Sequence, residues 1–77
     1  MSQITCVILT FNESLHIARA IENAKKVATR VIVVDSYSTD STINISKELR
    51  VDVFQNKFIS QAQQFEWAMQ NCNIQSE

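Results

Sequence analysis

Two uninterrupted apolar runs are the feature that most restricts the fold of this chain. Residues 3–10 read QITCVILT and residues 29–35 read TRVIVVD, and β-branched side chains are frequent in both. Continuous runs of this kind are typical of strands that are buried on both faces of a parallel sheet. Two parallel strands need a crossover between them, which is usually a helix. The pair therefore predicts a chain in which strands and helices alternate.

The segment between the two runs has the pattern of an amphipathic helix. In residues 11–28, apolar side chains recur at helical spacing and would form one buried stripe. Asn12 is the predicted N-cap, and Glu13 falls in the predicted first turn, where the helix dipole favours a carboxylate. Two lysines, Lys25 and Lys26, lie near the predicted helix end. The predicted stripe consists of Leu15, Ala18, Ile21 and Ala24.

The remaining sequence continues this alternation. Residues 36–50 read as a loop followed by a helix, residues 51–55 as a short third strand, and a last helix starts at Phe58. The order β-α-β-α-β-α predicts an α/β fold with a Rossmann-like parallel sheet. No linker divides residues 1–77, so one small domain is expected. The positions predicted to face the core are Ile43, Ile45 and Leu49 in the second helix and Ala62, Phe65, Ala68 and Met69 in the third, with Trp67 on its flank.

Composition excludes several classes of protein and site. Seven basic and eight acidic residues give a net charge of −1 without a basic patch, which argues against nucleic-acid binding. Glycine and proline are both absent, so the chain has no glycine-rich phosphate loop. Cys6 and Cys72 form no metal-binding motif and are expected to be reduced thiols that act as small hydrophobic filler in a cytosolic protein. The N-terminus lacks a signal-peptide pattern, and every apolar run is far shorter than the ~18 residues of a membrane helix.

Polar residues follow the two main predicted strands at the point where each strand ends. Asp35 ends the second run and the hydroxyl-rich residues 36–42 come next, while residues 10–13 (TFNE) end the first run. In open parallel sheets, ligands bind at the carboxyl ends of the strands. A carboxylate there can accept hydrogen bonds from a base N–H or from sugar hydroxyls. The alternative is that Asp35 only ends its strand or caps the next helix.

Three segments, in this order, resemble one known family. Residues 6–14 (CVILTFNES), 31–42 (VIVVDSYSTDST) and 53–69 (VFQNKFISQAQQFEWAM) are similar to the N-terminal part of family 2 glycosyltransferases. The resemblance is closest to bacterial enzymes that build lipopolysaccharide core or exopolysaccharide, and it extends from Ile4 to about Ile74. It implies a GT-A fold, of which residues 1–77 would be the nucleotide-sugar-binding half.

The resemblance also implies roles for individual residues. Asp35 would bind the base, commonly uracil, and Gln64 would approach the nucleotide side of the cleft. Thr39 and Asp40 match residues that open the second helix, and Asp40 is expected to hold the loop by capping. Glu66 stands where the family usually has asparagine, and a carboxylate near a diphosphate would be repulsive. The nucleotide-sugar-binding residues implied are Thr10, Phe11, Asn12, Glu13, Asp35, Ser38 and Gln64.

The chemistry of sugar transfer is implied for a longer parent protein. The family holds Mg²⁺ or Mn²⁺ with an Asp-x-Asp motif that residues 1–77 lack, and its catalytic base follows that motif. We therefore expect a chain truncated before Asp-x-Asp, without catalytic or metal-binding residues and inactive alone. The parent is expected to be an inverting glycosyltransferase (a hexosyltransferase) of cell-envelope polysaccharide or lipopolysaccharide synthesis. Its partners would be a UDP-sugar and a sugar or lipid-linked acceptor, and its location cytoplasmic and peripheral to the inner membrane.

Other interpretations of the chain stay open at this point. One is a non-enzymatic remnant or interaction module that keeps only the fold. Another is a flavodoxin-like half-domain that binds some other mononucleotide and makes no use of Asp35. An unpaired sheet edge also predicts self-association. Among single residues, His16 is expected on the surface and Trp67 and Phe65 in the core, where aromatic rings at helical spacing usually lie; Tyr37 either flanks a ligand or is exposed.

Overall fold

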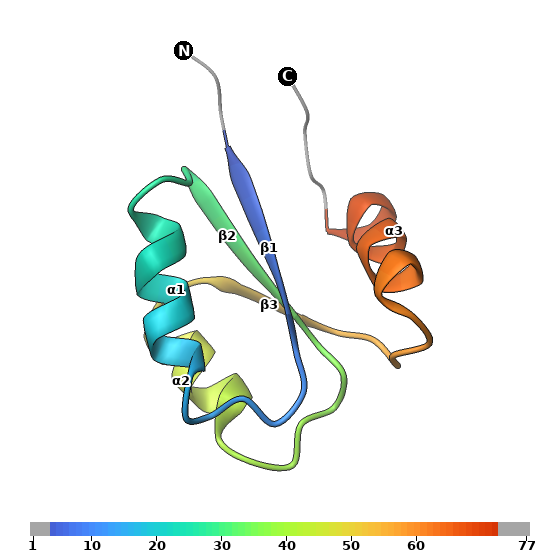
Figure 1. The fold of residues 1–77 in the computed structure, drawn as a ribbon, viewed down its shortest axis with the longest axis horizontal. Helices are drawn as coiled ribbons and strands as arrows, with labels where there is room; N and C mark the ends of the chain where they lie inside the picture. Colours follow the sequence, from blue (N-terminus) through green and yellow to red (C-terminus); the bar gives the residue numbers. More distant parts are fainter. Residues whose placement is uncertain (1–3, 73–77) are drawn as a thin grey trace.

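The computed structural model describes residues 4–72 and contains the alternation that the sequence predicts (Figure 1). The α/β fold class is therefore confirmed. Each strand is followed by a helix, and the chain of described residues ends with the third helix. The elements are β1 (Thr5–Thr10), α1 (Ile17–Lys25), β2 (Arg30–Asp35), α2 (Thr42–Glu48), β3 (Asp52–Gln55) and α3 (Gln61–Asn71).

The three strands form one parallel sheet in the order β1-β2-β3. β2 lies in the centre and is buried along nearly its whole length, which explains its continuous apolar sequence. The register pairs Thr10 of β1 with Asp35 of β2, and Asp35 with Gln55 of β3. The carboxyl ends of all three strands thus lie at the same end of the sheet, where the sequence predicts the ligand site.

Helices cover both faces of the sheet, and β2 contributes to both cores. α1 and α2 pack on one face, and α3 packs on the other (Figure 1). Val33 points to the first face, while Ile32 and Val34 point to the second, as the alternation of side chains along a strand requires. Trp67 of α3 meets Phe54 of β3 edge-on, with ring centroids 6.4 Å apart.

The first helix begins later than predicted, and Asn12 is not its N-cap. The helix starts at Ile17, with the exposed His16 in the N-cap position. Asn12 has a positive φ of 52°, whereas an N-cap residue normally has extended backbone. Glu13 consequently lies in the turn before the helix rather than in its first turn, and its carbonyl accepts from Ile17 N–H at 2.8 Å. Leu15, predicted in the buried stripe, is 90% exposed, and Ile17 takes the buried position.

The third helix also begins later than predicted, and a different side of it faces the sheet. It starts at Gln61, and the side chain of Ser60 caps it by accepting from Gln63 N–H at 3.2 Å. The row that packs on the sheet is Gln64, Ala68 and Cys72, three positions four residues apart, with the half-buried Trp67 beside it. The prediction that Ala62, Phe65 and Met69 face the core is therefore wrong, because they lie on the exposed side.

Two smaller predictions about burial have different outcomes. Cys72 is fully buried, as predicted for hydrophobic filler, and burial raises the pKa of its thiol. Of the second-helix positions predicted to face the core, Ile45 and Leu49 pack against the core formed with α1, and Ile43 is partly buried without joining it. The fully buried side chains of α2 are, however, the polar Thr42 and Ser46. A buried hydroxyl needs a hydrogen-bond partner, so these two positions indicate polar contacts within the fold.

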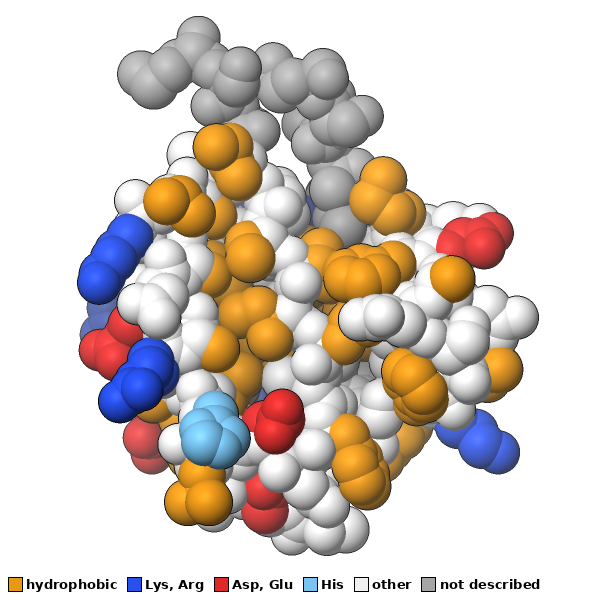
Figure 2. Space-filling view, in the orientation of Figure 1, with side chains coloured by type: hydrophobic (Ala, Val, Ile, Leu, Met, Phe, Trp, Pro, Cys, Tyr) orange, Lys and Arg blue, Asp and Glu red, His pale blue; other side chains and the backbone are white. Residues whose placement is uncertain are grey.

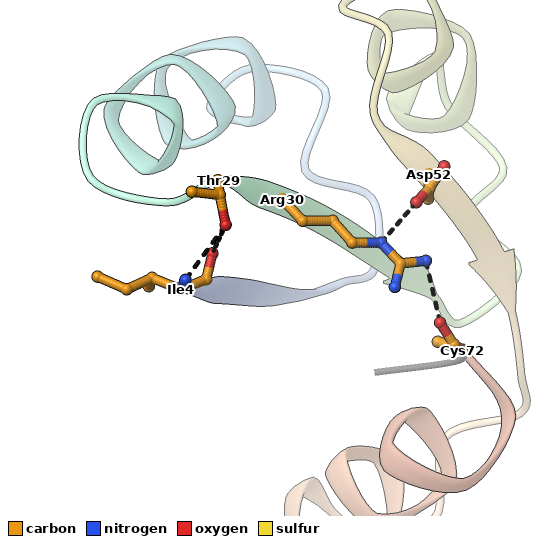
Figure 3. Close-up of polar contacts among 5 residues, drawn as sticks. All are labelled: Ile4, Thr29, Arg30, Asp52 and Cys72. Atoms are coloured by element: carbon orange, nitrogen blue, oxygen red, sulfur yellow. Dashed lines mark hydrogen bonds and ion pairs between the residues drawn. The ribbon is translucent and has the colours of Figure 1, made fainter. Parts of the chain in front are cut away.

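Side-chain hydrogen bonds stabilise the end of the sheet at which the strands begin (Figure 3). Thr29 exchanges two hydrogen bonds with the backbone of Ile4, at 3.2 and 3.0 Å. Arg30 donates to Asp52 at 2.9 Å and to the carbonyl of Cys72 at 3.0 Å. The starts of the strands and the end of α3 are thereby connected to one another.

Candidate functional site

The carboxylate of Asp35 is completely enclosed at the end of the central strand. Its side chain has 0% exposure. Oδ1 accepts hydrogen bonds from the hydroxyls of Thr10 at 2.7 Å and Ser38 at 2.5 Å, and Oδ2 accepts from Ser38 N–H at 2.6 Å. The contacts of Asp35 therefore join β1, β2 and the loop that follows β2. A base N–H could reach this carboxylate only if Ser38 moved.

The loops after β1 and β2 are bonded directly to each other. We call residues 12–16 and 37–41 the loop pair. Asn12 is central to it: its N–H donates to Ser38 Oγ at 2.8 Å, and its side-chain oxygen accepts from Thr39 N–H at 2.8 Å. The N–H of Glu13 donates to the hydroxyl of Thr42, the first residue of α2, at 2.8 Å. These contacts join two segments that are more than twenty residues apart in the sequence.

Asp40 lies at the start of α2 and contacts both loops. Oδ1 accepts from the N–H of Thr42 at 3.0 Å and also from the Thr42 hydroxyl, while Oδ2 accepts from Ser14 N–H at 3.1 Å. The Thr42 hydroxyl is the main reason why the pKa of the Asp40 carboxyl falls from 3.8 to about 2. Asp40 thus holds the two loops together, as expected, but Ser41 and not Asp40 is in the N-cap position of α2. Thr39, the other residue expected to cap this helix, contacts Asn12 instead.

A cavity of about 650 Å³ opens beside the loop pair, on the side of α3. We call it the strand-end cavity. Two aromatic side chains on its wall are open to solvent, Phe11 with 58% and Phe58 with 51% exposure. Lys57 is the one charged residue among the described residues that line it, so the lining is polar and apolar with a single positive charge. The lining residues are Leu9, Thr10, Phe11, Ser36, Lys57, Phe58 and Gln61.

Gln64 does not line the cavity but contacts the lining residue Ser36 from the protein interior. The side chain is 1% exposed and makes three hydrogen bonds. Its amide nitrogen donates to the Ser36 hydroxyl at 3.3 Å and to the Asn56 carbonyl at 3.1 Å, and its oxygen accepts from the Asn56 amide at 2.9 Å. Gln64 therefore positions the Ser36 side chain and the connection after β3. Glu66 lies on a separate hollow, which Asn56, Lys57 and Trp67 also line.

The residues singled out from the sequence fall into three groups. Thr10 and Phe11 face the strand-end cavity, Asn12, Glu13 and Ser38 belong to the loop pair, and Asp35 and Gln64 are buried behind. The lining residues that sequence reasoning missed are Ser36, Lys57, Phe58 and Gln61. The sequence pattern could have identified two of these four residues. Lys57 and Phe58 follow the third predicted strand, so the strand-end rule applied there would have marked them.

Two negative findings concern the described residues only. Within residues 4–72, no three or more His, Cys, Asp or Glu side chains lie close enough to hold a metal ion. The carboxylates of Asp35 and Asp40 are occupied by the hydrogen bonds described above, so these residues do not fit the divalent ion that the family resemblance implies. No helix in this part of the chain is long and apolar enough to cross a bilayer.

Comparison with known proteins gives a consistent result. The family model of glycosyl transferase family 2 matches residues 5–73. The chain is 40% identical over 72 residues to an uncharacterized glycosyltransferase of Rickettsia prowazekii, covering 94% of this chain and 25% of the relative. An uncharacterized glycosyltransferase of Rickettsia felis is 39% identical with the same coverage. The SPbeta prophage-derived glycosyltransferase SunS of Bacillus subtilis is 38% identical over 61 residues, which cover 71% of this chain and 14% of SunS. The chain thus spans about a quarter or less of these relatives.

Proposed function

The chain belongs to glycosyl transferase family 2, and we propose that its strand-end cavity binds the nucleotide of a nucleotide-diphosphate sugar, with a UDP-sugar as the donor. The observation that carries this proposal is the position of the cavity. It lies at the carboxyl ends of β1 and β2, which is where open parallel sheets bind ligands. Its volume of about 650 Å³ is in the range of small-molecule sites.

The lining of the cavity suits a nucleoside. Phe11 and Phe58 offer exposed aromatic faces on which a base can stack, and stacking is worth about 1–3 kcal/mol per base. The hydroxyls of Thr10 and Ser36 offer donors and acceptors for a base edge or ribose. Asp35, buried behind them, holds Thr10 in place by accepting its hydroxyl hydrogen. Direct contact between Asp35 and a uracil base is part of the proposal and requires displacement of Ser38.

We propose the remaining chemistry for a longer protein that contains this chain. That protein would be an inverting glycosyltransferase of cell-envelope polysaccharide or lipopolysaccharide synthesis, with a sugar or lipid-linked acceptor. It would act in the cytoplasm at the inner membrane, and carboxylates outside residues 1–77 would hold Mg²⁺ or Mn²⁺. Family membership and relatives that are named glycosyltransferases support sugar transfer by that longer protein. The inverting mechanism, the cell-envelope role, the location and the metal rest on the sequence resemblance alone. Residues 1–77 alone are expected to transfer no sugar, because they lack Asp-x-Asp.

A second candidate function is an interaction module, and one observation favours it. Within residues 4–72, β1 is an edge strand, and hydrophobic side chains gather over it on the face shown in Figure 2. The carbonyls of Ile4 and Thr10 face β2, so the backbone groups of alternate residues such as Val7 face away from the sheet. An unpaired edge of this kind can pair with a second copy of the chain. A clean monomer at high concentration in analytical ultracentrifugation would rule out pairing of β1 with a second copy.

An NMR titration of the ¹⁵N-labelled chain tests the nucleotide proposal. UDP is expected to shift the amides of residues 10–11, 36 and 57–61 more strongly than other nucleoside diphosphates do. Phe11→Ala should weaken the response, and Phe65→Ala, which changes an exposed ring of α3 outside the cavity, should not. A folded chain whose amides do not respond to UDP would contradict the proposal. Equal responses to all nucleotides would favour the flavodoxin-like interpretation.

A further inference from the structure

We propose that Lys57 binds the diphosphate of the donor and thereby orients it, with the phosphates toward the connection between β3 and α3 and the base toward Phe11 and the loop pair. This inference rests on the proposed function, because it assigns the two ends of the same ligand. It concerns a residue that the sequence does not mark as part of the site. The argument depends on where charge lies around the strand-end cavity.

The two sides of the cavity differ in charge. Among the described residues, three carboxylates lie near the strand ends: Asp35 ends β2 and is fully buried, while Glu13 and Asp40 belong to the loop pair. Glu13 lines a small separate hollow of about 50 Å³ on the side of α1. On the side of α3, Lys57 is the one charged residue of the described lining. Glu66 lies on the adjoining hollow, which Lys57 also lines, but Glu66 does not line the strand-end cavity. A diphosphate would be repelled by the first side and attracted by the second.

The Lys57 ammonium is available for this contact. Within residues 4–72, it makes no ion pair and no hydrogen bond, whereas the backbone carbonyl of Lys57 accepts from the Asn56 amide at 3.5 Å. The backbone on either side of Lys57 is held in place: Asn56 bonds Gln64, and Ser60 caps α3. A flexible cationic side chain therefore projects from a fixed backbone beside an open cavity. Its removal should leave the fold intact, because it takes part in no described side-chain contact.

A phosphate contact can be recognised by comparing UDP with uridine, because uridine has no phosphate and cannot make it. A stacking or structural residue affects uridine and UDP alike, whereas a cation that binds phosphate affects only UDP. The contact should also weaken as salt increases, because added ions screen charges at an exposed site. These two properties separate the proposed role of Lys57 from a general effect on the cavity.

The experiment compares Lys57→Gln with Lys26→Gln, a matched change at an exposed lysine after α1, outside the strand-end cavity. NMR shift titrations with uridine and with UDP are run at low and at high salt. Lys57→Gln should weaken UDP binding about tenfold, as expected for the loss of one hydrogen bond to a charged group, and leave uridine binding unchanged. It should also make UDP binding less sensitive to salt. Lys26→Gln should match the unmodified chain for both ligands.

Three results would overturn the inference. UDP affinity that is unchanged in Lys57→Gln would remove Lys57 from the site while leaving the proposed function standing. Equal weakening of uridine and UDP would make Lys57 a structural residue. An unmodified chain that binds neither ligand would overturn the proposed function and this inference with it. The salt dependence of the unmodified chain is an independent measurement: UDP affinity that does not change with salt would also contradict a charged contact.

Discussion

The loop pair and the strand-end cavity lie side by side at the same edge of the sheet and have opposite properties. In the loop pair, the polar groups of Asn12, Ser38 and Asp40 bond to one another across the two loops. In the cavity, two aromatic rings are exposed and a lysine has no described side-chain partner. A polar group that is already hydrogen-bonded within the protein has little interaction free energy left for a ligand. An exposed aromatic ring and a cation without a described partner have more. The comparison teaches that chemically suggestive residues can be structural, while the proposed ligand surface lies next to them.

The loop pair needs its hydrogen bonds because its backbone is strained. Asn12 and Tyr37 both have a positive φ, 52° and 59° respectively, in a chain without glycine. A residue with a Cβ atom in this conformation costs roughly 1–2 kcal/mol, with asparagine the better tolerated. The side chain of Asn12 and the enclosed carboxylate of Asp35 hold the two loops in these conformations.

Among the polar contacts at the strand ends, Asp35→Ala should have the largest effect on stability. The change leaves the donors of the buried Thr10 and the partly buried Ser38 without an acceptor, so the free energy of unfolding should fall by about 3 kcal/mol. Urea denaturation at neutral pH measures it. Asp52→Ala is the control, because it breaks the exposed ion pair with Arg30 and should cost under ~1 kcal/mol. Similar losses in the two variants would contradict the central role of Asp35.

Thr42→Val should have the next largest effect. The variant keeps the shape of a buried side chain and loses the hydroxyl that accepts from Glu13 N–H and donates to Asp40. The expected loss is about 1–2 kcal/mol in the same denaturation experiment. Ser46→Ala removes the other buried hydroxyl of α2, which donates only to the carbonyl of Thr42 within the helix. If both variants were equally stable, the loop pair would not depend on Thr42.

Asp40 predicts how stability changes in acid. Its pKa is lower in the folded chain, about 2, than its ordinary value of 3.8, so its contribution is complete above pH ~4 and disappears as the pH falls toward 2. Asp40→Asn cannot be protonated in this range. The free energy of unfolding should therefore fall less steeply between pH 4 and pH 2 in the variant than in the unmodified chain. Parallel pH profiles would show that the Asp40 hydrogen bonds contribute nothing to stability.

The smallest expected change in stability is in the cavity. Phe11→Ala should cost under ~1 kcal/mol, because the ring is largely exposed and supports no core cluster. Trp67→Ala, which removes a ring packed on the core of the α3 face, should cost about 3 kcal/mol. Thermal unfolding of both variants checks the difference. A large loss in Phe11→Ala would mean that the cavity wall is structural and would weaken the contrast with the loop pair.

The sequence by itself determined the fold class and the order of elements. Continuous apolar runs and helical spacing are local properties, and they predicted each strand, each helix and the edge where the strands end. The sequence also marked Thr10 and Phe11, which face the strand-end cavity. The predictions of strands and helices succeeded because burial patterns along a strand or helix depend on near neighbours in the sequence.

Only the tertiary structure decided which residues at that edge bond to one another and which face the cavity. Parallel pairing places Thr10 beside Asp35, and the crossing of α3 brings Lys57 and Phe58 beside Phe11. The delayed start of α1 follows from the same contacts, since Asn12 bonds the second loop instead of its own helix. The physical reason is that these hydrogen bonds and packing contacts join segments far apart in the chain. These long-range contacts stabilise the fold by more than the local preference of Asn12 for an N-cap position. They can form only when the sheet brings the distant segments together.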